Sequence, residues 1–100
     1  MSLQKFKTYQ LSIELYRLCR TLSVPEHLRD QLLRAAASVT LNLAEGSAKP
    51  TAKDQRKYYA ISFGSLRECQ AVFALLEIRH ERIAHLVDIL GASLFKLSRP

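Results

Sequence analysis

A row of basic residues is the clearest chemical signal in the sequence, because cations at helical spacing can bind phosphate groups. Four of them share one side of a predicted helix: Lys53, Arg56, Lys57 and Arg67. Small residues beside them would let the phosphate backbone of RNA or DNA come close, with little sequence preference. One of the neighbouring tyrosines, Tyr58 or Tyr59, could stack a base while the other joins the core. A solvated helix face is the alternative interpretation, and these residues alone do not separate the two.

A second group of polar residues lies on two consecutive predicted helices. Its members are Arg34, Ser38, Asn42, Glu45, Ser65 and Glu68. Spacings of four and three residues put Ser38, Asn42 and Glu45 on one helix face. Glu68 on the next helix could reach Arg34 across the hairpin. We interpret the group as a structural network that fixes helix register, with a functional polar pocket as the alternative.

Other reactive residue types do not form a recognisable catalytic or metal site. Glu77 and His80 spell the Glu-x-x-His unit of di-iron bundles, but such a site needs a second copy and two further carboxylates. Cys19 and Cys69 each lie within an apolar helical pattern, which predicts two buried thiols rather than nucleophiles. No glycine-rich phosphate loop is present. The sequence therefore predicts no enzyme activity, no catalytic residue, no metal, no cofactor and no small-molecule substrate.

Length and composition describe the domain that must hold these residues. One hundred residues, 48% of them hydrophobic, suit a single domain over 1–100 with one modest core. The net charge of +6 favours acidic partners such as nucleic acid. The first residues lack a signal peptide, no stretch approaches the ~18 apolar residues of a membrane span, and the two cysteines do not form a disulfide framework. We expect a cytoplasmic protein without membrane contact.

Hydrophobic spacing and sparse Gly and Pro predict an all-α fold, an antiparallel up-down bundle of four helices. The first helix is expected over about 5–22, and the second begins in a Ser-x-x-Glu capping box formed by Ser23 and Glu26. It ends near residue 45, where Gly46 suits the left-handed position after a helix. Thr51 is expected to cap the third helix, with Asp54 three residues later. A polar turn over 79–82 separates it from the fourth, which shows its apolar stripe over 83–97.

One glycine stands inside the predicted third helix, where it costs about 1 kcal/mol relative to alanine. Counting back from the hairpin loop places Gly64 and Ser65 beside Arg34 to Ala37. This pairing predicts that the two helix backbones approach closely at Gly64. A large side chain there, as in Gly64→Leu, would then push the helices apart and destabilise the protein.

The first helix carries two apolar faces, whereas a helix in a small monomeric bundle needs only one. One face is formed by Phe6, Tyr9, Ile13 and Tyr16, and the nearly opposite face by Leu11, Leu15, Leu18, Cys19 and Leu22. The second face requires its own cover, and a neighbouring subunit is the simplest one. The sequence therefore predicts self-association, without fixing the number of subunits or the face that points outward.

Two sequence blocks resemble a known bacterial family. The segment 29–46 reads RDQLLRAAASVTLNLAEG, and a following helix contains GSLRE over 64–68. Together with the closing LVDILGASLFKL, these blocks resemble the four-helix-bundle proteins encoded within intervening sequences of 23S ribosomal RNA genes. Thr40 stands where that family often has proline, the aromatic usual near the start of helix one is weakly represented, and the turn before the fourth helix lacks the usual glycine.

The resemblance implies a homo-oligomer, with a five-subunit ring as the expected form. Similar bundles serve as accessory subunits of retroelement reverse transcriptases and bind nucleic acid through basic surfaces. Two hypotheses therefore stand. The first is a non-enzymatic, oligomeric protein that binds RNA or DNA backbone through its basic row. The second is a structural or adaptor module that binds another protein, with its charge incidental.

Overall fold

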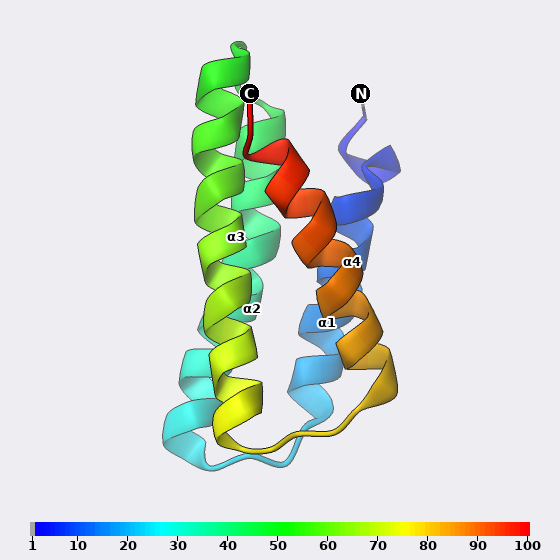
Figure 1. Cartoon of the computed structure of the whole chain (residues 1–100), viewed down its shortest axis with the longest axis vertical. Coiled ribbons are helices and arrows are strands. Elements are labelled where there is room, and N and C mark those ends of the chain that lie inside the picture. The colour runs from blue at the N-terminus through cyan, green and yellow to red at the C-terminus, as the bar shows by residue number, and fades with distance from the viewer. Residues whose placement is uncertain (1) are drawn as a thin grey trace.

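Four α-helices follow one another in the computed structural model, which describes residues 2–100 (Figure 1). They are α1 (Lys7–Thr21), α2 (Glu26–Ser47), α3 (Ala52–Leu75) and α4 (Glu81–Leu97), preceded by a 3-10 turn over Leu3–Lys5. Successive helices run in opposite directions along the long axis of the bundle (Figure 1). Contacts join α1 to α2, α2 to α3, α3 to α4, and α4 back to α1. The predicted all-α, four-helix fold is confirmed, and no helix of residues 2–100 is long and apolar enough to cross a membrane.

The core runs along the inner stripe of each helix. Leucines supply most of the fully enclosed volume, which suits their favourable helix propensity and low-entropy packing. The hydrophobic side chains exposed by 1% or less are Leu15, Cys19, Leu32, Ala36, Val39, Leu43, Leu66, Cys69, Leu86, Leu90 and Leu94. Burying one such leucine contributes roughly 1.5–3 kcal/mol. The clean stripe predicted for the fourth helix is therefore the face that closes the bundle.

The helix starts agree with one of the two predicted caps, and a third helix has a cap that the sequence analysis did not predict. The Thr51 hydroxyl accepts a hydrogen bond from the Asp54 amide, 3.2 Å away, and caps α3 as expected. His80 begins α4 in the same manner, because its Nδ1 accepts from the Ile83 amide at 3.2 Å. The capping box predicted at Ser23 is wrong: Pro25 occupies the N-cap of α2 without a side-chain bond. Proline has a φ suited to a helix start, so the helix begins there instead.

Neither glycine of the α2–α3 hairpin has the role predicted for it. Gly46 is not a left-handed terminus but lies within α2, which continues to Ser47. A Cβ at Gly46 would lie 2.8 Å from Cε1 of Tyr59, so this glycine marks the close approach. Gly64 is exposed, and a Cβ there would meet nothing within 4 Å. The close approach predicted at Gly64 is therefore wrong.

Hydroxyl groups show how the helices are aligned. Ser62 is fully buried, and its Oγ donates to the Val39 carbonyl at 2.8 Å, which ties α3 to α2. Ser65 Oγ lies 2.7 Å from Ser38 Oγ, so Ser65 faces Ser38 rather than the earlier segment 34–37. Because α2 continues to Ser47 instead of ending near residue 45, the loop is shorter and a later part of α2 lies opposite α3. A similar link joins α1 to α2 through Ser12 and Thr40, 2.8 Å apart.

The turn between α3 and α4 contains a residue in the left-handed region. Glu77 has φ 53°, and it is the one non-glycine residue with positive φ among those described. The Ile78 amide donates to the Phe73 carbonyl at 3.0 Å, and the Glu77 amide donates to Ala74 at 3.2 Å. These two bonds complete a Schellman-type end of α3, whose left-handed position usually belongs to glycine. Glutamate therefore holds a conformation that its Cβ disfavours.

Replacing this residue by glycine should stabilise the fold. Glu77→Gly is expected to raise the free energy of unfolding by about 0.5–1 kcal/mol, because relief of the left-handed strain exceeds glycine's entropic cost. Urea denaturation followed by circular dichroism measures the change. Glu77→Ala is the control, since alanine keeps the Cβ and should give no gain. Equal effects of both substitutions would contradict the assignment of strain to the backbone.

Candidate nucleic-acid interface

The first turns of α3 carry most of the predicted basic row. The Thr51 cap begins the helix, and spacings of three and four residues then bring Lys53, Arg56 and Lys57 onto one side. Lys53 and Lys57 are exposed, whereas Arg56 is half-buried. Arg67 follows Arg56 by eleven residues, about three helical turns, so it continues the same side of α3. Sequence and structure thus agree on a line of four cations, here called the α3 basic row.

The charges of the α3 basic row are not neutralised within the chain. Among residues 2–100, neither ion pair involves Lys53, Arg56, Lys57 or Arg67. Arg67 does donate to Gln70 Oε1 at 3.1 Å, a neutral partner that orients the guanidinium and leaves its charge in place. A row of unpaired cations on a helix surface raises the local concentration of anions and binds phosphate groups readily.

Two tyrosines at the start of α3 divide between the surface and the core, as predicted. Tyr59 is 6% exposed and packs edge-to-face on Phe6, with ring centroids 6.1 Å apart. Burial raises the pKa of the Tyr59 hydroxyl. Tyr58 is half-buried, with the ammonium groups of Lys49 and Lys57 at 4.9 and 5.8 Å from its ring centroid. Tyr58 is thus the aromatic side chain beside the basic row.

Lys49 strengthens this end of the bundle, although it belongs to the loop before α3. Its Nζ lies 3.2 Å from Glu45 Oε1, across one turn at the end of α2. The hydrogen bond to Glu45, followed by the attraction of that carboxylate, raises the pKa of Lys49 and keeps it cationic. Because its charge is shared with Glu45, Lys49 contributes less to anion binding than the unpaired cations of α3.

A cluster that sequence reasoning missed lies where α3 meets α4. The Arg67 guanidinium carbon is 4.9 Å from the Phe63 ring centroid, and that of Arg99 is 4.2 Å from the Phe95 centroid. The two rings meet edge-to-face at 6.4 Å and 77°. Phe95 lies outside the apolar stripe of α4 and is 48% exposed. The repeated Phe-x-x-x-Arg spacing over 63–67 and 95–99 was the available signal.

The predicted polar network forms only in part. Asn42 Nδ2 donates to the Ser38 carbonyl at 2.9 Å and lies 3.0 Å from Ser38 Oγ, which in turn contacts Ser65. Glu45 pairs with Lys49 instead of joining this group. Arg34 and Glu68 are exposed, and the part of the chain that the structure describes contains no ion pair between them. Ser38, Asn42 and Ser65 therefore form the contact between α2 and α3, whereas the other three predicted members do not join it.

At the opposite end of the bundle, α4 is joined to α1 by charge. Arg82 forms a two-pronged pair with Glu14, with Nε–Oε2 and Nη2–Oε1 distances of 2.5 and 2.6 Å. This contact, more than the partial burial that opposes it, lowers the pKa of Glu14. Arg82 is thereby neutralised, in contrast to the cations of α3.

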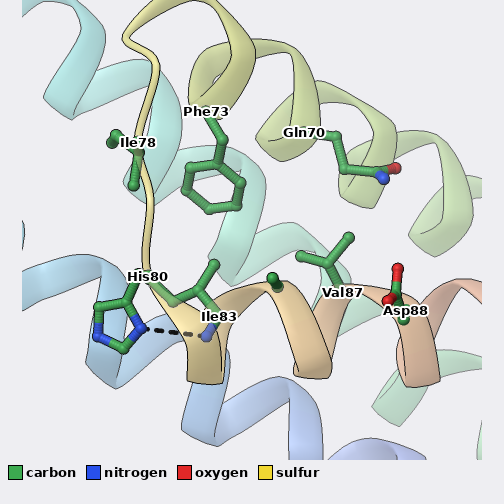
Figure 2. A pocket seen from close by; sticks show the side chains of 8 residues that line it. Gln70, Phe73, Ile78, His80, Ile83, Val87 and Asp88 are labelled. Carbon is green, nitrogen blue, oxygen red and sulfur yellow. Dashed lines mark hydrogen bonds between the residues drawn. The ribbon is translucent and has the colours of Figure 1, made fainter.

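The two cysteines and His80 also carry reactive side chains, and the structure gives each of them a structural role. Cys19 and Cys69 are free thiols without solvent exposure, and burial raises the pKa of each to about 12. Such thiols are poor nucleophiles. A hollow of 230 Å³ lies between α3 and the start of α4, and its lining includes Phe73, Ile78, Val87, Gln70 and Asp88. Figure 2 shows these side chains. His80 points its Nδ1 at the Ile83 amide there, so that nitrogen is occupied as a helix cap.

A comparison with known protein families finds one family whose pattern this chain matches. Residues 4–83 match the family described as 23S rRNA-intervening sequence protein. The chain belongs to this family. The match includes α1, α2, α3 and the first turn of α4, and it therefore includes the α3 basic row and the Ser38–Asn42–Ser65 contacts. No curated protein matches the chain.

Two positions named above as departures from the family resemblance have structural roles of their own in this chain. Thr40 uses its hydroxyl to contact Ser12 of α1. Glu77, in the turn before α4, holds the left-handed conformation that glycine would adopt freely. Phe95 and Arg99 lie beyond the matched residues, so the α4 half of the aromatic cluster is outside the part that the family match covers.

Proposed function

We propose that this intervening-sequence protein is a non-enzymatic, oligomeric, cytoplasmic protein that binds the phosphate backbone of RNA or DNA. The observation that carries the proposal is the α3 basic row, four cations on one side of a helix without carboxylate partners. The net charge of +6 adds a long-range attraction for a polyanion. Free buried thiols suit a reducing compartment, and their high pKa argues against a nucleophilic role.

The chemistry of the row favours backbone contacts over recognition of a base sequence. Lysine and arginine cations attract phosphate oxygens whatever bases they carry, and binding releases counterions from the nucleic acid. Each neutralised phosphate contributes a log–log salt slope of roughly −0.7 to −0.9. Sequence preference would require bidentate contacts to base edges in a groove, which a row of isolated cations does not provide.

Fluorescence anisotropy with labelled strands tests the proposal. Single- and double-stranded RNA and DNA are each titrated with the protein at two or more salt concentrations. We expect binding at low salt that weakens steeply as salt rises and differs little between sequences of the same strand type. Failure of every strand to bind at low salt would overturn the proposal and favour the protein-binding adaptor.

The oligomeric part of the proposal rests on an apolar face formed by α1 and α2. Leu15 and Cys19 show that one face of α1 is used in the core. On the other side of α1, Ile13 and Tyr16 border a hollow of 160 Å³ that α2 completes with Leu41 and smaller side chains. Leu41 is 66% exposed beside this apolar hollow. A projecting leucine next to an apolar depression suits contact with a second copy of the same chain, and a ring of five remains the form we propose.

A charge placed at this face should reduce self-association. Wild-type protein is expected to show several times the 11.4 kDa chain mass in light scattering at micromolar concentration. Leu41→Lys should shift the protein toward monomer, because a desolvated lysine would face apolar surface in the interface. Leu75→Lys is the matched control, since Leu75 is 71% exposed at the far end of α3. A monomeric wild type, or equal dissociation by both variants, would contradict the proposed face.

A further inference from the structure

Two arginine–phenylalanine pairs form one continuous patch across the junction of α3 and α4. Arg67 covers Phe63 on α3, and Arg99, just past the end of α4, covers Phe95. The ring of Phe63 meets that of Phe95 edge-to-face, with centroids 6.4 Å apart. The four side chains therefore line up in the order Arg67, Phe63, Phe95 and Arg99, here called the Arg–Phe patch. Two segments about thirty residues apart in sequence build it from the same Phe-x-x-x-Arg spacing.

The exposure of the patch differs from that of a core cluster. Phe95 is 48% exposed, and both arginines are exposed, whereas Phe63 is half-buried against the core. Phe63 thus anchors the patch, and Phe95 presents its ring to solvent. Neither arginine takes part in an ion pair among the described residues. Each guanidinium is held against a ring on one side. Arg67 donates to Gln70 from Nη1 only, so both arginines keep N–H groups with which they can bind a ligand.

The ligand that fits the Arg–Phe patch has a planar group that can stack on a ring and an anionic group that can bind arginine. A nucleobase can stack on an exposed aromatic ring or on the plane of a guanidinium, while the adjoining phosphate accepts hydrogen bonds from arginine. In a duplex the base faces are already stacked on one another and cannot reach a protein side chain. An unpaired strand, by contrast, offers free base faces.

The patch also lies at one end of the α3 basic row. Arg67 belongs to both features, and it follows Arg56 on the same side of α3 about three turns later. A strand whose phosphates follow the row from Lys53 would therefore reach the patch at Arg67. In Figure 1 the start of α3 and the end of α4 lie at the same end of the bundle. Backbone contacts and base contacts are thus available to one strand.

We infer that the Arg–Phe patch stacks unpaired bases, which makes single-stranded nucleic acid the preferred ligand of this protein. This inference rests on the proposed function and adds to it the strand type and a second set of contacts. Charge on the row holds the phosphates of either strand type, whereas Phe95 and Arg99 act on unpaired bases alone. Oligouridylate, oligothymidylate and a duplex of the same length distinguish RNA, DNA and paired strands.

The test compares binding by full-length wild type, Phe95→Leu and Arg99→Lys in anisotropy titrations at one low salt concentration. Phe95→Leu keeps an apolar side chain but removes the ring face, and Arg99→Lys keeps the charge but removes the planar cation. Each should weaken single-strand binding by about 5- to 100-fold, the range that base–aromatic stacking provides. Duplex binding and the log–log salt slope should not change. Ile89→Ala, at another exposed apolar position of α4, is the control and should bind every strand like wild type.

The outcomes separate this inference from the proposed function. If wild type binds no strand, both are overturned. If wild type binds but both variants hold single strands as tightly as it does, the patch is not a stacking site and the α3 basic row alone carries binding. If the variants lose duplex and single-strand binding equally, the patch contributes charge or folding rather than stacking, which also overturns the inference. Because Arg99→Lys lies at the exposed end of the chain, it remains informative even if Phe95→Leu folds poorly.

Discussion

Gly46→Ala is expected to lower the free energy of unfolding by about 1–3 kcal/mol, although alanine is the better helix former. The added Cβ would lie 2.8 Å from Cε1 of Tyr59 and 3.1 Å from Cβ of Tyr58. The Tyr59 ring is 6% exposed and held against Phe6, so it cannot swing aside without disturbing the core. The backbones of α2 and α3 would have to separate instead. Urea denaturation of both proteins, followed by circular dichroism, measures the difference.

The same substitution at the other helical glycine of the hairpin should act in the opposite direction. Gly64 is exposed and its Cβ would meet nothing within 4 Å. Gly64→Ala should therefore raise the free energy of unfolding by about 0.8–1 kcal/mol, the difference in helix propensity. A stabilised Gly46→Ala would contradict the close approach at Tyr59. A destabilised Gly64→Ala would contradict the open surface at that position.

Removing the start of the α3 basic row should have the largest effect on binding. Replacing Lys53, Arg56 and Lys57 together by alanine should weaken binding about 100-fold at low salt, because three phosphate contacts per subunit are lost. The loss should be similar for all sequences, and the salt slope should flatten. The helical circular-dichroism signal should remain, since alanine is a strong helix former, Lys53 and Lys57 are exposed, and Arg56 is only half-buried.

A control of equal charge change shows whether position matters. Arg17, Arg20 and Arg79 are exposed cations away from the start of α3, and their combined replacement by alanine lowers the net charge by the same amount. This control should reduce affinity only slightly, through the weaker long-range field. Equal losses in the two triple variants would show that net charge, rather than the α3 basic row, governs binding. A greater loss in the control would place the site around α1 or the turn between α3 and α4.

Local patterns in the sequence were sufficient to predict the helices but not how they pair. The apolar stripe of 83–97 and the Thr51 cap depend on neighbours within a few residues, and the structure confirms both. A turn before α4 is present as well, but it lies over 76–80 instead of the predicted 79–82, because α3 ends at Leu75 and α4 begins at Glu81. Gly46 and Gly64 depend instead on what lies across the hairpin. A glycine after an apolar run is as compatible with a helix end as with a close contact, and only the position of Tyr59 decides between them.

In the candidate site, too, features within one helix could be predicted from the sequence, whereas contacts between helices could not. Its cations could be found from spacing along α3, because one helix brings them together. Phe95 and Arg99 could not be placed in the same way, since their meeting with Phe63 and Arg67 depends on how α4 crosses α3. The predicted contact between Arg34 and Glu68 is not among the ion pairs of the described residues, and both side chains are exposed to solvent instead.

The most direct measurement of the central claim is ultraviolet crosslinking of the full chain to oligouridylate, with the attached peptides identified by mass spectrometry. Aromatic side chains that contact bases should crosslink, so we predict attachment in peptides that contain Tyr58, Phe63 and Phe95. These residues lie beside the α3 basic row and in the Arg–Phe patch. Crosslinks confined to α1 and the start of α2, around Arg17, Arg20 and Arg29, would contradict the account.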